Sequence, residues 1–254
     1  MSIPDVAYSI VSFRATVRSV SGSGPLCSHA IDRLLPALFP GEAGRHVAMH
    51  TLKEGRFLKL KDISTKAGAS EYASAVSRLD EAPRGGLDLS LISWLKGHPF
   101  HAPSGDEIWV TIRRALDVEH AEYGLRVIVG RDKADLLPDI AADFCTSFEV
   151  LSGCAFAPGG YWPSWADHRW ELPALAPPRV AGPTWLLIAP ADANRLLTRS
   201  PTAIEWAKAV RPYSGGGAIW QLSTEYEGPQ GEALDNWVQL MESLDLWSRP
   251  GVLQ

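Results

Sequence analysis

The sequence predicts an α+β fold: a mostly antiparallel sheet with packed helices and an amphipathic helix at the C-terminus. Residues 107–113 and 125–129 alternate apolar and polar side chains, which is typical of strands with one face in a core. The polar connector 117–122 is short, so the two strands are expected to form an antiparallel pair. Helical patterns are interleaved with the strands, and together with the antiparallel pair this favours α+β over a doubly wound parallel sheet.

The N-terminal half carries further strand and helix patterns. Residues 7–20 contain alternating, β-branched side chains and predict a strand with one face in water. Apolar residues at helical spacing predict a helix over 26–39, in which Pro36 predicts a kink or an early end. A short strand is expected at 56–61 and a weaker helix at 71–79.

The C-terminal half predicts three helices and two strands. Helical spacing covers 136–144, and a buried strand is expected at 185–188. A short helix is expected at 203–210, and a strand at 218–222 follows a run of three glycines. The last helix has the clearest apolar stripe, formed by Ala233, Trp237, Leu240, Met241 and Leu244.

The length of the chain indicates its number of domains, and its charge indicates which partners it suits. The 254 residues suit a single α+β domain over 1–254, with a division into two sub-halves at about 1–131 and 132–254 as the alternative. The first sub-half has 16 Lys+Arg against 14 Asp+Glu, a net charge of +2, and the second has 8 against 15, a net charge of −7. An acidic surface repels nucleic acid and attracts basic partners, although simple solubility also explains a charge of this size.

Targeting signals and cysteine usage indicate a cytoplasmic protein. The N-terminus has no basic region before an apolar run, and no stretch of about 18 apolar residues occurs, so neither a signal peptide nor a membrane span is expected. Cys27, Cys145 and Cys154 form an odd set without C-x-x-C spacing, which indicates free thiols in a reducing compartment.

Residues of metal-binding type occur in two places without the spacing that a metal site needs. His46 and His50 stand four apart, but valine follows the first histidine where the zinc-protease pattern needs glutamate. His98, His101 and Asp106 lie close together in the chain, but a proline between the histidines prevents regular helical spacing. Both groups are interpreted as incidental.

Nucleophile and phosphate-binding patterns are incomplete too. Cys27 stands near His29, but neighbours along a helix point in different directions, so Cys27 is interpreted as structural. Gly215–Gly217 precede a strand instead of a helix, which argues against a phosphate loop. The sequence therefore predicts no catalytic residue, no cofactor and no metal, and favours a protein that is not an enzyme.

Two short segments predict a surface for a protein partner. Residues 161–171 hold four aromatics with a proline and charged groups, so they form either a loop pinned into the core or a rigid aromatic surface. Residues 225–227, Glu-Tyr-Glu, follow the strand at 218–222 and form either a solvated strand end or an acidic contact with a basic partner. The predicted interface consists of Tyr161, Trp162, Trp165, Asp167, Arg169, Trp170, Glu225, Tyr226 and Glu227.

The order of elements from about residue 107 resembles a known family. Two strands and a helix lead to the segment 152–156, the Trp-rich loop and the strand at 185–188. The most specific piece is Gly-Gly-Ala-Ile-Trp-Gln-Leu at 216–222, followed by an acidic loop and the last helix. This order is similar to bacterial immunity proteins of polymorphic-toxin and type VI secretion systems, in particular immunity protein family fifty-two. The resemblance implies an antitoxin that binds a cognate toxin, often a nuclease, without catalysis or a cofactor.

Two other classes of protein stay open. A small hydrolase or ligand-binding enzyme would have its pocket between the halves, with His98, His101 and Asp106 as the nearest candidate groups. A structural scaffold or oligomer subunit would show a large apolar self-interface. Nucleic acid is not expected as a partner, because the aromatic-rich half is the acidic half.

Overall fold

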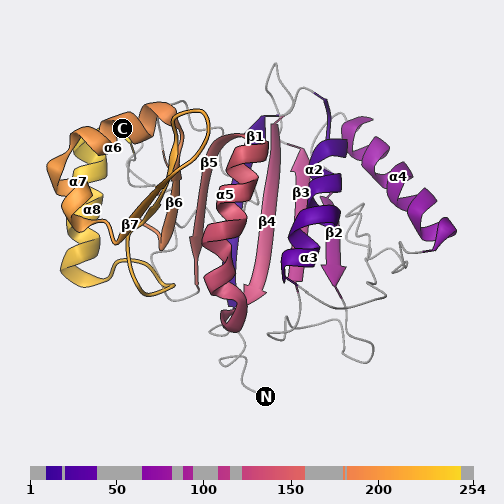
Figure 1. Cartoon of the computed structure of the whole chain (residues 1–254), viewed down its shortest axis with the longest axis horizontal. Coiled ribbons are helices and arrows are strands. Elements are labelled where there is room, and N and C mark those ends of the chain that lie inside the picture. Colours follow the sequence, from indigo (N-terminus) through magenta and orange to yellow (C-terminus); the bar gives the residue numbers. More distant parts are fainter. Residues whose placement is uncertain are drawn as a thin grey trace, which may run out of the picture. The chain divides into compact units, whose positions relative to one another are not determined.

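The fold is an α+β arrangement of antiparallel strands and helices (Figure 1). The chain divides into two compact units. The computed structural model describes residues 10–18, 21–38, 65–81, 88–93, 108–114, 122–157, 180 and 182–246. Unit 1 comprises Met1–Ile10 and Arg18–Leu136, and unit 2 comprises Val11–Val17 and Leu137–Gln254. Every strand pair with a described register is antiparallel, which confirms the predicted α+β class.

The sheet of unit 1 contains the pair predicted from alternation. Its strands are β2 (Asp88–Ser93), β3 (Ile108–Arg114) and β4 (Glu122–Gly130), adjacent in that order. In β4 the odd-numbered residues from Tyr123 to Val129 are buried, as expected for side chains that alternate between two faces. The strand β2 was not predicted from the sequence.

The first helical run of unit 1 shows how a proline is accommodated. It consists of α2 (Gly24–His29), the π-helical turn η1 (Ala30–Leu34) and α3 (Leu35–Leu38). Pro36 has no N–H to donate, and its ring would clash with a carbonyl one turn earlier in a regular α-helix. The widened π turn directly before it relieves this conflict, so the expected kink takes the form of a π segment.

A second helix of unit 1, α4 (Lys66–Glu81), is attached through polar contacts. The Oδ1 atom of Asp80 accepts hydrogen bonds from the backbone N–H of Ser23 (2.8 Å) and from the hydroxyl of Tyr123 (2.6 Å). One carboxylate thus joins α4 to the start of α2 and to β4. The helix is longer than the segment 71–79 that helical spacing predicted, and it covers that segment.

Unit 2 has helices on both faces of its sheet. Its strands follow the order β1-β5-β6-β8-β7, and the predicted strands at 7–20, 185–188 and 218–222 are confirmed. The elements are β1 (Ile10–Arg18), α5 (Leu137–Ser147), β5 (Glu149–Phe156), β6 (Leu186–Ala189), α6 (Ala191–Arg199), α7 (Pro201–Trp206), β7 (Ala209–Pro212), β8 (Ala218–Gln221) and α8 (Gly231–Ser243). The 3-10 turn η2 (Arg131–Leu136) precedes α5 in the chain.

One face of this sheet packs against α5. Phe144 of α5 meets Phe13 of β1 edge to face, with ring centroids 6.2 Å apart. A Cβ built on Gly153 of β5 would lie 2.7 Å from Ile188 and 3.3 Å from the side chain of Ala15. Only glycine fits at that position, because a side chain there would collide with the neighbouring strands.

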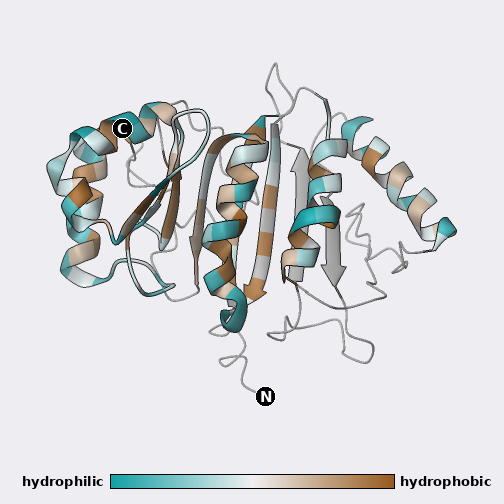
Figure 2. Cartoon of the chain, viewed as in Figure 1, coloured by the Kyte–Doolittle hydropathy of each residue, from teal (hydrophilic) through white to brown (hydrophobic). Residues whose placement is uncertain are grey.

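The other face packs against α6, α7 and α8. Leu187 of β6 and Trp220 of β8 are opposite each other in register and belong to one buried apolar cluster with Trp237 and Met241 of α8. Trp206 at the end of α7 meets Trp237 edge to face at 5.8 Å. In Figure 2, β6 is hydrophobic along its length, whereas α5 alternates between hydrophobic and hydrophilic residues, as expected for a helix with one face in water.

The predicted water-facing side of β1 is wrong. Ser12, Arg14 and Thr16, the polar residues of the alternating pattern, are all buried. The guanidinium of Arg14 lies over the ring of Phe156, 5.5 Å from its centroid. Alternation separates two faces of a strand, but it does not distinguish water from a polar, covered environment.

The predicted helix over 203–210 is shorter than expected. It ends at Trp206, because Ala207 adopts an extended conformation and the N–H of Lys208 donates to the carbonyl of Gln221 (2.8 Å). The following residues form the edge strand β7, which pairs with β8 through a tight hairpin turn. Gly215 and Gly216 adopt φ values of 89° and 85° in this turn, a left-handed conformation that glycine adopts readily.

Candidate partner-binding turn

The turn between β8 and α8 is built by a serine and a glycine. The N–H of Glu225 donates to Oγ of Ser223 (3.0 Å), and the N–H of Gly228 donates to the carbonyl of Glu225 (2.9 Å). Gly228 has a φ of 90°, which lets the chain reverse direction at that point. These bonds fix residues 223–228 as a defined turn, here called the acidic turn.

The acidic turn is anchored to two other segments of unit 2. The N–H of Ala157, directly after β5, donates to the carbonyl of Tyr226 (2.8 Å). The ring of Tyr226 meets the ring of Trp185 edge to face, with centroids 4.7 Å apart and an interplanar angle of 76°. A Cβ built on Gly228 would lie 3.0 Å from the backbone nitrogen of Trp185, so the two backbones approach closely.

The acidic side chains of the turn differ in exposure. Glu225 is exposed, whereas Tyr226 and Glu227 are half-buried. Because the hydrogen bonds fix the backbone of the turn, a cation that binds the carboxylate orders only the glutamate side chain, and an arginine or lysine of a protein partner is a suitable cation. The arrangement therefore suits recognition of a basic surface.

The structure brings together only part of the predicted interface. Glu225, Tyr226 and Glu227 lie in one turn, as the chain order requires. Ala157, the last described residue before the Trp-rich segment, is hydrogen-bonded to that turn. The other predicted interface residues lie outside the described part of the chain: Tyr161, Trp162, Trp165, Asp167, Arg169 and Trp170.

Sequence reasoning missed the role of Trp185. The sequence placed this residue at the start of a buried strand, and the structure shows it at 2% exposure directly before β6. Its ring and its backbone both contact the acidic turn, which lies about 40 positions later in the chain. Nothing in the local sequence indicates a partner at that separation.

A second cluster of reactive residue types lies in unit 1. The hydroxyl of Tyr72 donates to the carbonyl of Cys27 (3.2 Å), and burial raises the pKa of the Cys27 thiol to about 11. A reactive cysteine needs a lowered pKa, so this thiol is not an activated nucleophile. Cys145 and Cys154 are also free and buried, and burial raises the pKa of each to about 12.

The histidine groups considered as metal ligands lie outside the described residues. They are His46, His50, His98, His101 and Asp106. Among the residues that the structure does describe, no group of three or more His, Cys, Asp or Glu side chains is placed to hold a metal ion. Within the same ranges, no helix has both the length and the apolar character needed to cross a bilayer.

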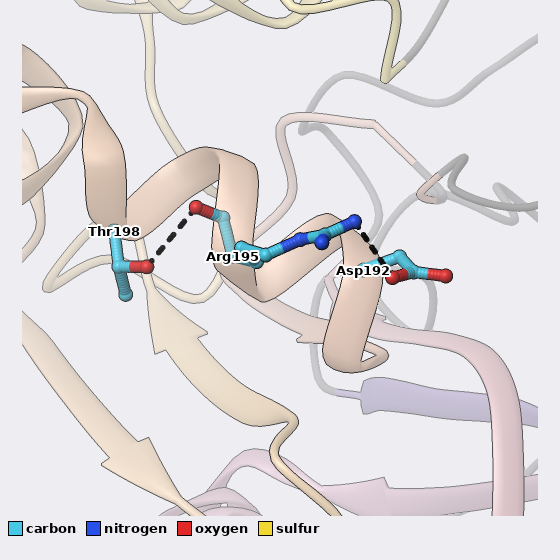
Figure 3. Close-up of polar contacts among 3 residues, drawn as sticks. All are labelled: Asp192, Arg195 and Thr198. Atoms are coloured by element: carbon cyan, nitrogen blue, oxygen red, sulfur yellow. Dashed lines mark hydrogen bonds and ion pairs between the residues drawn. The ribbon is translucent and has the colours of Figure 1, made fainter.

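On the exposed side of α6, charged side chains form an ion pair with each other. Arg195 donates to Asp192 at 3.0 Å, and Thr198 donates to the carbonyl of Arg195 (Figure 3). Both charged side chains are more than half exposed, so water and salt weaken the pair. Glu225 differs, because its contacts in the turn are made by its backbone and leave its carboxylate at the surface.

The comparisons with known proteins concern the fold. No family model matches the chain, and no curated protein is similar to it in sequence. Among solved structures, the chain is similar to "Pseudomonas aeruginosa T6SS protein PA0821", with a TM-score of 0.54 and 13% identity over 95% of this chain and 78% of that chain. At this identity the likeness shows a shared fold and leaves the activity to be argued from the site.

Proposed function

We propose that this protein is an immunity protein that binds a cognate secreted toxin and neutralises it by direct contact. The expected toxin carries a nuclease domain, and the interaction takes place in the cytoplasm. The protein acts without a cofactor and without catalysing a reaction, and neither nucleic acid nor a membrane is its partner.

The observation that carries this proposal is the anchored acidic turn. Glu225 is exposed on a turn that Ser223 and Gly228 hold in one conformation. Tyr226, a residue type enriched at the centres of interfaces, is half-buried beside it. An acidic contact favours a basic partner surface, and the ordered backbone of the turn lowers the entropy that is lost when the contact forms.

Two further observations support the same partner. Nuclease clefts that bind phosphate are basic, and the net charge of −7 over residues 132–254 complements such a surface. The fold is also similar to that of a protein described as a T6SS protein, which is compatible with the T6SS-associated role proposed here. Membership of immunity protein family fifty-two stays a prediction, because no family model matches the chain.

The direct test is to identify a toxin and measure neutralisation. A tagged copy is expressed in the native bacterium, and the chain that co-purifies at matched stoichiometry is produced alone in a host cell. We expect growth arrest from that chain alone and normal growth when this protein is co-expressed. Continued arrest in the presence of this protein would rule out neutralisation.

A charge-reversal experiment locates the interface. The double variant Glu225→Lys with Glu227→Lys should weaken binding of the purified toxin about 10- to 100-fold, mainly through a slower association rate. The association rate of this variant should also depend less on salt concentration than that of the wild type. The matched control is Glu232→Lys with Asp235→Lys on α8, which makes the same change of net charge elsewhere in unit 2. Equal losses in both double variants would show that overall charge, and not the acidic turn, drives binding.

A further inference from the structure

Trp185 contacts the acidic turn in three ways. Its ring meets the ring of Tyr226, its carbonyl accepts the N–H of Leu222 (3.0 Å), and its backbone nitrogen lies against Gly228. Leu222 directly precedes the acidic turn, and Gly228 is its last residue. A single residue that belongs to the β6 side of the sheet therefore holds both ends and the middle of the turn.

The side chain of Trp185 is buried, so it cannot contact a partner directly. No described residue accepts a hydrogen bond from its indole Nε1, and leaving a buried donor without an acceptor is destabilising. A hydrogen bond of the indole therefore does not explain the residue type at this position. The contribution of Trp185 comes from the shape of its ring against Tyr226 and from its backbone contacts.

We infer that Trp185 is a positioning residue for the partner-binding turn, and this inference rests on the proposed function. Trp185 holds the turn in the conformation that presents Glu225. Without the ring contact, Tyr226 loses the packing that Trp185 provides, and the carboxylate of Glu225 samples more positions. The binding contribution of Glu225 therefore depends on Trp185, although the two side chains act at different places.

The first experiment measures the turn without any partner. In the full-length protein, Trp185→Leu should speed hydrogen exchange at the amide of Ala157, which donates to Tyr226, about tenfold relative to core amides of β6. Trp185→Phe keeps an aromatic edge and should retain most of the protection. Trp237→Leu is the matched control, because Trp237 is equally buried at 2% but its ring packs against Trp206 and not against Tyr226.

The second experiment measures coupling in the complex. With the purified co-purifying toxin as the probe, Glu225→Gln should lower affinity about fivefold in the wild-type background and less than twofold in the Trp185→Leu background. In the Trp237→Leu background the fivefold loss should remain. A purely structural role of Trp185 would lower stability in both tryptophan variants without removing the effect of Glu225→Gln.

The outcomes are distinguishable. Unchanged exchange at Ala157 in Trp185→Leu, or an unchanged effect of Glu225→Gln, overturns the positioning role while the proposed function stands. A wild-type protein that does not bind the toxin overturns the proposed function, and the exchange data then decide whether Trp185 holds the turn. If Trp185→Leu fails to fold, Gly228→Ala gives a second route, because its Cβ would push the turn away from the Trp185 backbone.

Discussion

The helices α8 and α4 are fixed in different ways. Helix α8 buries Trp237, Val238 and Met241 in the apolar cluster of unit 2. None of the side chains described on α4 is buried. Hydrogen bonds join this helix to its neighbours through Asp80, Tyr72 and the carbonyl of Val76, which accepts from the hydroxyl of Ser23 (3.3 Å). Apolar packing leaves a periodic stripe in the sequence, so the attachment of α8 was predicted. Helical spacing also predicted part of α4, but a single hydrogen-bonding residue such as Asp80 leaves no periodic pattern, so the contacts of this helix were not predicted.

Truncation of the apolar anchor should give the largest loss of stability. Trp237→Ala removes a ring that is 2% exposed, and we expect the free energy of unfolding to fall by about 3–5 kcal/mol. Urea denaturation followed by circular dichroism measures this change. Gln239→Ala on the exposed side of α8 is the control and should stay within about 0.5 kcal/mol of the wild type. Similar losses in both variants would contradict the described packing of α8.

Removal of the hydrogen bonds that Asp80 accepts should cause a smaller but clear loss of stability. Asp80→Ala leaves the Tyr123 hydroxyl and the Ser23 N–H without their acceptor, and we expect a loss of about 2–3 kcal/mol. The same urea titration applies. Glu81→Ala removes an exposed carboxylate one position further along α4 and should change stability by less than about 0.5 kcal/mol. If Asp80→Ala is neutral, the carboxylate is not what holds α4.

The cysteines can report which unit opens. Cys27 lies in unit 1 beside α4, and Cys145 lies in unit 2 on α5. Both thiols are buried, so alkylation requires local opening. Asp80→Ala should speed alkylation of Cys27 about tenfold more than that of Cys145, and Trp237→Ala should do the reverse, as mass spectrometry of timed samples can show. Equal acceleration of both thiols would mean that the two units open together.

The pH dependence of stability should show the smallest effect. Because burial raises the pKa of Cys27 from 9.0 to about 11, the folded state keeps the thiol protonated where the unfolded state ionises it. This contribution is complete below pH 9 and is lost as the pH rises toward 11, which amounts to about 1 kcal/mol between pH 9 and pH 10. Cys27→Ala should lack this part of the slope in urea titrations at several pH values. If stability falls equally with pH in the wild type and in Cys27→Ala, the pKa of the Cys27 thiol is not raised by burial.

Strands β5 and β7 were not predicted from the sequence, because neither has an alternating pattern. Strand β5 is buried at most positions, and it contains small and polar residues such as Ser152 and Gly153, so its sequence shows no alternation. Strand β7 is exposed at every position, so it has no apolar face to reveal it. Pairing with a neighbour specifies both strands, and pairing is not a local property of the sequence.

The candidate site divides in the same way. The sequence marked Glu225, Tyr226 and Glu227 as a possible acidic contact, because residue types and turn formers are local information. It did not indicate that Trp185 and Ala157 hold this turn, because those contacts join segments about 40 to 70 positions apart. Contacts at such separation depend on how the whole of unit 2 folds.

The sequence by itself determined the fold class, the pair β3–β4, the apolar stripe of α8 except for Ala233, which is exposed, and the acidic character of the second half. Each of these follows from local periodicity or from composition, which short-range sterics and burial control. Only the tertiary structure decided that the polar face of β1 is covered, that Asp80 holds α4 and that Trp185 holds the acidic turn. Those three features arise because residues far apart in the chain come into contact in the folded state. The local sequence around each residue does not indicate such long-range contacts.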